Sequence, residues 1–253
     1  MIESLWVALA TYSRIPTPRT EWTAKSLRYS LCFFPLVGVV VGLVELIWLA
    51  LAAWLKFPAF LTGAVGCAVP ILITGGIHMD GFMDTVDALS ARKPREEMLK
   101  ILKDSHVGAF ASMGCALYLI LDAGALSALP LREALALAAS FVVSRAMSAF
   151  FVAVIPPARP DGMARAVADA AQEAGKDVLK RASVAWAVGF GFLMLWAAPV
   201  SGGIALGWAA VAAVMYLRVL KRFGGVTGDL AGWFLQVCEV GFALALAIGG
   251  RIG

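Results

Sequence analysis

The sequence predicts an all-α protein, a polytopic membrane helical bundle of about seven transmembrane helices with polar loops on the cytoplasmic side. Hydrophobic residues make up 61% of the 253 residues and charged residues 15%, whereas soluble domains average about 45–50% and 25%. The apolar residues form continuous runs that do not alternate with polar ones, which favours helices over a β-barrel. No Pro- or Ser-rich linker and no fixed-period repeat divides the chain, so we expect residues 1–253 to form a single integral membrane domain.

Seven apolar runs approach the length of about 20 residues that one membrane crossing needs. The predicted spans are 31–55, 59–77, 107–129, 131–155, 184–200, 203–219 and 231–249. Ahead of them, residues 4–11 predict an interfacial helix that stops before Pro16. The sequence APVSGG predicts a tight turn between the fifth and sixth spans. The longest polar interval, residues 158–183, predicts a surface helix over 163–180.

The lysine and arginine residues predict the orientation of the bundle. Segments 14–30, 78–106, 156–183 and 218–230 hold seventeen of them, whereas the alternate turns hold only Lys56, Arg132 and Arg251. Because cytoplasmic loops carry the positive excess, we expect the N-terminus inside and the C-terminus outside, with the lipid bilayer as a partner. The basic residues are dispersed without interleaved aromatic side chains, so the net charge of +4 does not indicate nucleic-acid binding.

The stretch GGIHMDGFMDTVDAL, residues 75–89, gathers three aspartates directly after an uncharged run. Asp80, Asp84 and Asp87 stand at i, i+4 and i+7, so on a helix they share an arc of roughly 40–60°. Carboxylates crowded on one face call for a cation, and hard oxygen ligands suit Mg²⁺. The ordinary alternative is a solvated helix face, favoured near a helix N-terminus by the macrodipole.

His78 is predicted to lie in the turn before this helix, because it falls about 160° from Asp80 on a helical wheel. Three glycines of this stretch would let the backbone approach a phosphate closely. They are Gly75, Gly76 and Gly81.

Two further polar clusters each begin a predicted span. The segment LKILKDSHVGAF holds Lys103, Asp104, Ser105 and His106. Either Asp104 or Ser105 caps the next helix, or the cluster offers a phosphate clamp with one more metal ligand. The segment GGVTGDLAG holds Thr227 and Asp229, which either cap a helix or bind a phosphate at its N-terminus.

Arg145 lies inside a predicted span, where an unpaired charge costs at least a few kcal/mol. We therefore expect its side chain to face the bundle interior and to reach a phosphate or an acidic partner. Glu45, Asp122 and Glu239 are the acidic candidates inside spans. A purely structural ion pair is the alternative to a functional charge.

Taken together, six segments resemble the cobalamin synthase family, also called adenosylcobinamide-GDP ribazoletransferases. The resemblance covers nearly the whole chain, and the order and spacing of the segments make it specific. The segments are YSRIPTP (12–18), FFPLVGVVVG (33–42), GGIHMDGFMDTVDAL (75–89), MLKILKDSHVGAF (98–110), ARPDGMA (158–164) and GGVTGDLAG (224–232). His106 stands where the family often has arginine, so its contribution differs from the family pattern.

The resemblance implies that a ribose hydroxyl of α-ribazole, or of its 5′-phosphate, attacks adenosylcobinamide-GDP and that GMP leaves. It implies a Mg²⁺-dependent enzyme of the bacterial inner membrane with its active site facing the cytoplasm. The implied metal ligands are Asp80, Asp84, Asp87 and Asp104, with Asp84 or Asp87 as the alternative general base. The implied substrate-binding residues are Arg14, His78, Lys103, Ser105, His106, Arg145, Arg159, Thr227 and Asp229. Further expected partners are a second copy of the chain and other cobalamin-assembly enzymes.

Two other functions fit the same composition. An ion-coupled transporter would line a path with the acids and Arg145, but the acids cluster near one rim and no inverted repeat is evident. A different Mg²⁺-dependent membrane phosphotransferase would resemble CDP-alcohol phosphotransferases. The chain lacks their Asp-Gly-x-x-Ala-Arg run, which leaves them a chemical analogy.

Overall fold

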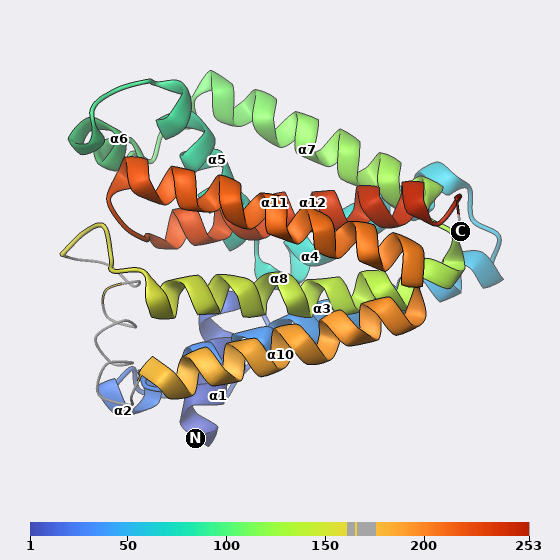
Figure 1. Ribbon diagram of the computed structural model, residues 1–253, viewed down its shortest axis with the longest axis horizontal. Coiled ribbons are helices and arrows are strands. Elements are labelled where there is room, and N and C mark those ends of the chain that lie inside the picture. The colour runs from blue at the N-terminus through green and yellow to red at the C-terminus, as the bar shows by residue number, and fades with distance from the viewer. Residues whose placement is uncertain (161–164, 166–175, 253) are drawn as a thin grey trace.

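The apolar runs of the sequence form helices that lie side by side along one long axis (Figure 1). The computed structural model describes residues 1–160, 165 and 176–252. The long helices are α3 (Ser30–Trp54), α4 (Ala59–Thr74), α5 (Ile77–Ser90), α7 (Ala109–Ala128), α8 (Ala134–Val154), α10 (Lys176–Ala197), α11 (Pro199–Phe223) and α12 (Gly228–Gly249). The shorter elements are α1 (Ile2–Tyr12), α2 (Ala24–Leu27), α6 (Arg95–Ile101) and the 3₁₀ turn η1 (Leu131–Glu133).

Six helices of the described chain are long and apolar enough to cross a membrane: α3, α7, α8 (together with η1), α10, α11 and α12. A seventh crossing exists if α4 and α5, which meet at 97°, count as one broken span. Many large apolar side chains on the periphery are exposed, among them Phe60, Leu72, Ile120 and Phe192. This composition and surface are those of an integral membrane protein.

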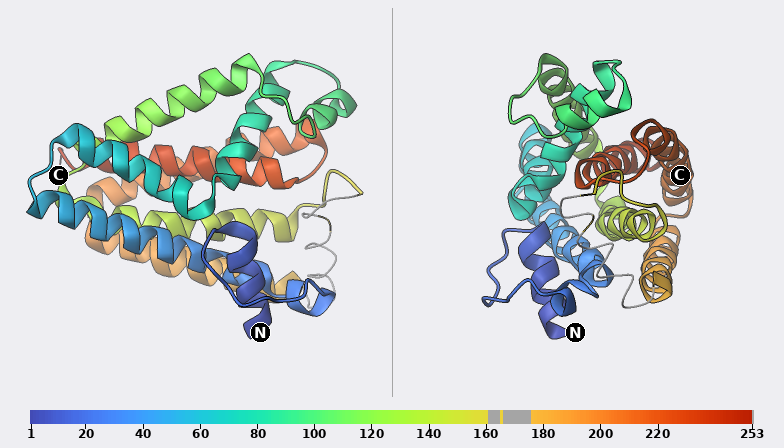
Figure 2. Two further views of the ribbon diagram at one scale, coloured as in Figure 1. Left: turned by 180° about the vertical axis from the view of Figure 1, so that it is seen from behind. Right: turned by 90° about the vertical axis from the view of Figure 1, so that its left-hand side faces the viewer.

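The centre of the bundle is formed by α8 and α12, whose side chains are mostly buried. Small residues let α3 pack closely against α8. A Cβ on Gly38 would lie 2.4 Å from the carbonyl oxygen of Phe141, and one on Gly42 would lie 2.4 Å from that of Ala138. Such small-residue contacts are how membrane helices approach each other. Figure 2 shows α10 and α11 on one side of this centre and α4, α5 and α7 on the other.

The span predicted over 59–77 is shorter than expected, and the chain bends sharply where it ends. Helix α4 ends at Thr74, and Gly75 and Gly76 follow with φ angles of 67° and 79°. This left-handed conformation suits glycine and stops the helix. The chain then starts α5 in a new direction, which takes the acidic stretch across the bundle (Figure 2).

The prediction that His78 lies in a turn is also wrong, because α5 already begins at Ile77. Gly76 is the residue before the helix, and its carbonyl oxygen accepts a hydrogen bond from the backbone N–H of Asp80 at 2.8 Å. The turn therefore consists of Gly75 and Gly76 alone. His78 is part of the helix, and its side chain is buried.

The turn predicted for APVSGG is shorter than expected. Helix α10 ends at Ala197, and α11 begins at Pro199, so the turn consists of Ala198. Proline is favoured at the first position of a helix because it lacks an N–H to satisfy there. Gly202, predicted in the turn, is in α11, where it packs against the carbonyl of Met194.

The predicted spans 31–55, 107–129, 131–155 and 231–249 begin and end within a few residues of observed helices, and the predicted N-terminal helix is α1. The fifth span was predicted to begin at 184, whereas α10 begins at Lys176, and the sixth was predicted over 203–219, whereas α11 runs from Pro199 to Phe223. The predicted surface helix over 163–180 falls outside the described residues, except for residue 165 and for 176–180, where α10 begins. The turns that follow α3 and α7, together with the C-terminus, lie at one end of the bundle. Helices α2 and α6 lie at the other (Figure 1).

Candidate active site

The acidic stretch lies where α5 crosses the first turns of α12. A Cβ on Gly81 would lie 2.8 Å from both the Cα and the carbonyl oxygen of Asp229. Only glycine at position 81 permits this approach of two backbones. The crossing therefore brings the α5 acids beside Asp229, which is 148 positions away in the sequence from Gly81.

Asp80, Asp84 and Asp229 form the carboxylate set of this crossing. Asp84 interacts electrostatically with both of the others and with the guanidinium of Arg159. Arg159 Nη2 lies 3.8 Å from Asp229 Oδ2 and donates to the carbonyl oxygen of Leu99 at 3.0 Å. Arg159 thus interacts with Asp84 and Asp229, and Asp80 adds a third carboxylate beside them, so this site has an excess of negative charge.

A short backbone pairing holds Arg159 in place. Val226 N–H donates to the Pro156 carbonyl at 3.0 Å, and Ala158 N–H donates to the Val226 carbonyl at 2.9 Å. The two loops that precede α12 and follow α8 are thereby joined. The pairing sets Arg159 opposite the first turn of α12.

Thr227 caps α12, as one of the two sequence interpretations proposed. Its Oγ1 accepts a hydrogen bond from Leu230 N–H at 3.2 Å and donates to Asp229 Oδ2 at 3.3 Å. Capping satisfies a backbone donor of the first turn and orients Asp229 at the same time.

Asp87 contacts a different helix from the other α5 acids. Its Oδ2 accepts from Gly108 N–H at 2.7 Å, and its Oδ1 accepts from Ala111 N–H at 2.8 Å. Both carboxylate oxygens therefore accept hydrogen bonds from the N-terminus of α7, where backbone donors and the helix dipole favour a negative charge. The expectation that Asp104 or Ser105 caps this helix is wrong, because Asp87 supplies the cap from α5.

The cluster before α7 is exposed. Asp104 Oδ1 accepts hydrogen bonds from the backbone N–H of His106 at 3.0 Å and from its Nδ1 at 2.7 Å. These two bonds hold the pKa of Asp104 below its usual value. Lys103 and Ser105 are exposed on the same loop.

Within the part of the chain that the structure describes, no three acidic, histidine or cysteine side chains are placed to hold a metal ion by themselves.

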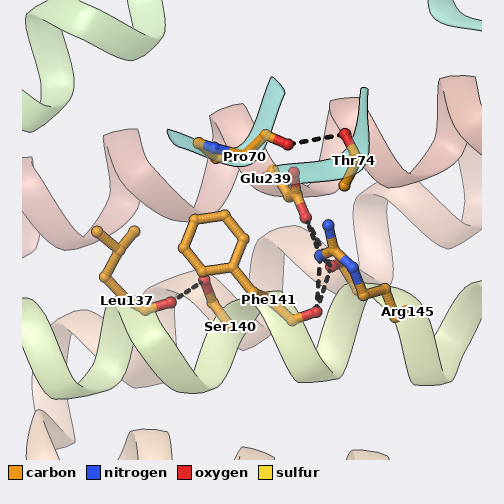
Figure 3. Close-up of polar contacts among 8 residues, drawn as sticks. Pro70, Thr74, Leu137, Ser140, Phe141, Arg145 and Glu239 are labelled. Carbon is orange, nitrogen blue, oxygen red and sulfur yellow. Dashed lines mark hydrogen bonds and ion pairs between the residues drawn. The ribbon is translucent and has the colours of Figure 1, made fainter. Parts of the chain in front are cut away.

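Arg145 faces the interior, as predicted, and is 0% exposed (Figure 3). Its Nη1 forms an ion pair with Glu239 Oε1 and donates to the Phe141 carbonyl at 2.9 Å. Ser144 Oγ donates to the same Glu239 oxygen at 3.1 Å. The acidic partner is thus Glu239 of α12.

Arg14 lies at the bend between α4 and α5. Its backbone N–H donates to the Ile73 carbonyl at 2.8 Å, and its exposed side chain passes over Gly75. The segment YSRIPTP is thereby fixed to the bend that directs the acids.

A cavity of about 310 Å³ adjoins the carboxylate set. Its polar edge includes Asp80 and Asp229, and its wall includes His78, 6% exposed. The sequence interpretation missed the aromatic part of the wall, Tyr12 and Phe34. Both belong to segments that carried the family resemblance, which was the available signal.

The cobalamin-5-phosphate synthase family matches residues 4–247. An adenosylcobinamide-GDP ribazoletransferase of Lachnoclostridium phytofermentans is 40% identical over 248 residues, covering 98% of this chain and 94% of the relative. The proteins of the same name from Desulfitobacterium hafniense and Rhizobium johnstonii are 33% and 31% identical, with at least 94% of each chain covered. No solved structure matches. The chain belongs to the cobalamin-5-phosphate synthase family.

Proposed function

We propose that this protein is an adenosylcobinamide-GDP ribazoletransferase. It joins α-ribazole, or α-ribazole 5′-phosphate, to adenosylcobinamide-GDP and releases GMP with adenosylcobalamin or its 5′-phosphate. The match to the family over residues 4–247 supports this reaction. The observation that carries the proposal is the set of three carboxylates with one arginine, beside a cavity at the polar end of a membrane bundle.

The residues at the crossing fit Mg²⁺ in charge and in ligand type. Asp80, Asp84 and Asp229 offer carboxylate oxygens in excess of the positive charge of Arg159. Mg²⁺ in phosphoryl-transfer sites usually takes one or two carboxylates and completes its coordination with water and substrate phosphates. When bound, the ion would neutralise charge on the diphosphate during displacement. Asp104 is paired with His106 on an exposed loop and is therefore not among the ligands that we propose.

With Asp80 and Asp229 as the two carboxylates that would hold the ion, Asp84 is the candidate general base. It accepts the proton of the attacking ribose hydroxyl. The hydroxyl oxygen forms a bond to the phosphorus that carries cobinamide, and the bond from that phosphorus to the bridging oxygen breaks. GMP leaves with the electron pair of this bond. Arg159 binds the charged oxygens of the diphosphate, and Asp87 positions α5 against α7.

We place the site on the cytoplasmic face of a bacterial inner membrane. The loops at the end of the bundle that bears the site carry most of the lysine and arginine residues, the pattern of cytoplasmic loops. One substrate is a nucleotide derivative and the other a nucleoside or its 5′-phosphate, and a site that opens to the aqueous phase would receive both.

Mixing the substrates tests the proposal. Purified full-length protein, incubated with adenosylcobinamide-GDP, α-ribazole and Mg²⁺, is expected to release one GMP for each adenosylcobalamin formed. Omission of α-ribazole should abolish GMP release. Folded protein that releases no GMP from the complete mixture, but moves a substrate across the membrane of a proteoliposome, would instead support a transporter.

A further inference from the structure

We propose that the cavity beside the carboxylate set binds the heteroaromatic base of the nucleoside substrate, and that the corrinoid substrate binds outside it. This inference rests on the proposed function and assigns one of the two substrates to a subsite. The cavity lies among α1, α3, α5, α8 and α12.

The wall of the cavity is aromatic on one side. The ring of Phe34 lies 4.3 Å from that of Tyr12 and 5.6 Å from that of His78, measured between centroids. Trp22 adds a fourth ring, 50% exposed. Aromatic side chains are the usual partners of planar bases, which they contact through ring faces and edges.

The buried imidazole of His78 supplies a polar contact in this wall. Its Nε2 is buried and has no hydrogen-bond partner among the described residues. A buried polar atom without a partner is costly, so a ligand that satisfies it is favoured. A benzimidazole-type nucleoside has one unsubstituted ring nitrogen, which can accept a hydrogen bond from an imidazole N–H.

Another part of the cavity border is acidic, and this sets the direction in which the nucleoside would lie. Asp80, Thr227 and Asp229 border the cavity there. A base placed against Tyr12 and Phe34 leaves its ribose at this edge, where hydroxyl groups donate to carboxylates. The attacking hydroxyl is then beside the carboxylate set without any movement of α5.

The volume of the cavity is large enough for the base of the nucleoside and too small for the corrinoid. About 310 Å³ is near the lower limit of small-molecule pockets, roughly 300 Å³. This space suits a bicyclic base with part of its ribose, whereas a corrin macrocycle is several times larger. The corrinoid must therefore approach the diphosphate from outside the cavity.

The test measures, for each variant, KM for α-ribazole and KM for adenosylcobinamide-GDP separately. We expect Trp22→Leu and His78→Leu each to raise KM for α-ribazole roughly tenfold, the loss typical of one base-stacking contact for Trp22 and of one hydrogen bond for His78. KM for adenosylcobinamide-GDP should stay within about twofold of the parent value. Trp196→Leu is the matched control, because Trp196 is 71% exposed on α10 and lies outside the cavity lining. Its two constants should equal those of the parent.

The outcomes are distinguishable. A rise in KM for adenosylcobinamide-GDP instead would assign the cavity to the corrinoid, and unchanged constants for both variants would place the base elsewhere. Trp22→Leu decides the matter if His78→Leu fails to fold. If the parent protein shows no turnover, the proposed function fails. Equilibrium dialysis with α-ribazole alone then tests the cavity, since binding by the parent that Trp22→Leu weakens supports it and no binding overturns it.

Discussion

Asp87 differs from the other aspartates of α5 in what its oxygens contact. Both oxygens accept backbone N–H groups of α7, from Gly108 and Ala111. A carboxylate provides two acceptors, whereas an asparagine side chain has one acceptor and one NH₂ group that would face a donor. Asp87 therefore has a structural role that Asp84 lacks.

We expect Asp87→Asn to destabilise the protein by about 1–3 kcal/mol, because one N–H of the first turn of α7 loses its acceptor. Thermal unfolding in detergent would show a lower Tm for this variant than for the parent. Asp84→Asn is the matched control, and its Tm should be equal to or higher than that of the parent, because removing this charge relieves the repulsion from Asp80 and Asp229. Equal Tm values for Asp87→Asn and the parent would rule out the capping role.

The Arg145–Glu239 ion pair is buried in the centre of the bundle. Removing one partner of such a pair typically costs about 3–5 kcal/mol, because the other charge is left buried. We expect Arg145→Leu to reduce the yield of folded protein sharply and Arg145→Leu with Glu239→Leu to recover much of it. Size-exclusion chromatography of detergent extracts measures both. A fully folded single variant would contradict this role.

Among the elements, α5 owes its direction to the glycine pair at the bend. Gly76 has a φ angle of 79°, and a Cβ added there would meet no atom within 4 Å. Gly76→Ala therefore tests backbone conformation without a steric clash. The left-handed conformation costs a residue with a side chain about 1–2 kcal/mol.

We predict that Gly76→Ala lowers Tm and turnover together, because the bend both starts α5 and directs its acids. Gly124→Ala in α7 is the matched control, since it too meets no neighbouring atom but lies inside a helix. There alanine is the better helix former, so no loss is expected. A Gly76→Ala variant as stable and active as the parent would show that the bend tolerates another geometry.

The elements also show what sequence reasoning could and could not predict. Continuous apolar runs located the spans, and the i, i+4, i+7 spacing placed the acids on one helix. Hydropathy reports the polarity of side chains and not the backbone φ angle. The apolar run over 59–77 therefore gave no indication of the bend at Gly75. The cap from Asp87 to α7 is a contact between two helices, which local capping rules cannot reveal.

The site shows the same division between local and non-local information. Asp80, Asp84, Thr227 and Asp229 were predicted as site residues from local patterns and from the family resemblance. The crossing that brings Asp229 beside Asp84 depends on Gly81, whose packing is visible only in three dimensions. The aromatic wall combines residues of α1, α3 and α5, and no local pattern links them.

At the scale of the whole molecule, the basic residues predict the orientation in the membrane. Reporter fusions after Lys56 and Arg132 should report the outside, and fusions after Arg95 and Lys176 the inside, because loops rich in lysine and arginine stay in the cytoplasm. Alkaline phosphatase and green fluorescent protein fusions together measure this. A cytoplasmic signal after Arg132 would reverse α7 and α8 and contradict the topology.

The catalytic use of the carboxylate set is tested most directly by the turnover of Asp84→Asn over a Mg²⁺ titration. The substitution keeps the size of the side chain and removes its charge, so we expect GMP release to fall by about 10²-fold or more. Asp177→Asn, an equal change of charge on an exposed residue of α10, is the control and should match the parent. An Asp84→Asn variant that turns over like the parent at every Mg²⁺ concentration would place the chemistry elsewhere in the molecule.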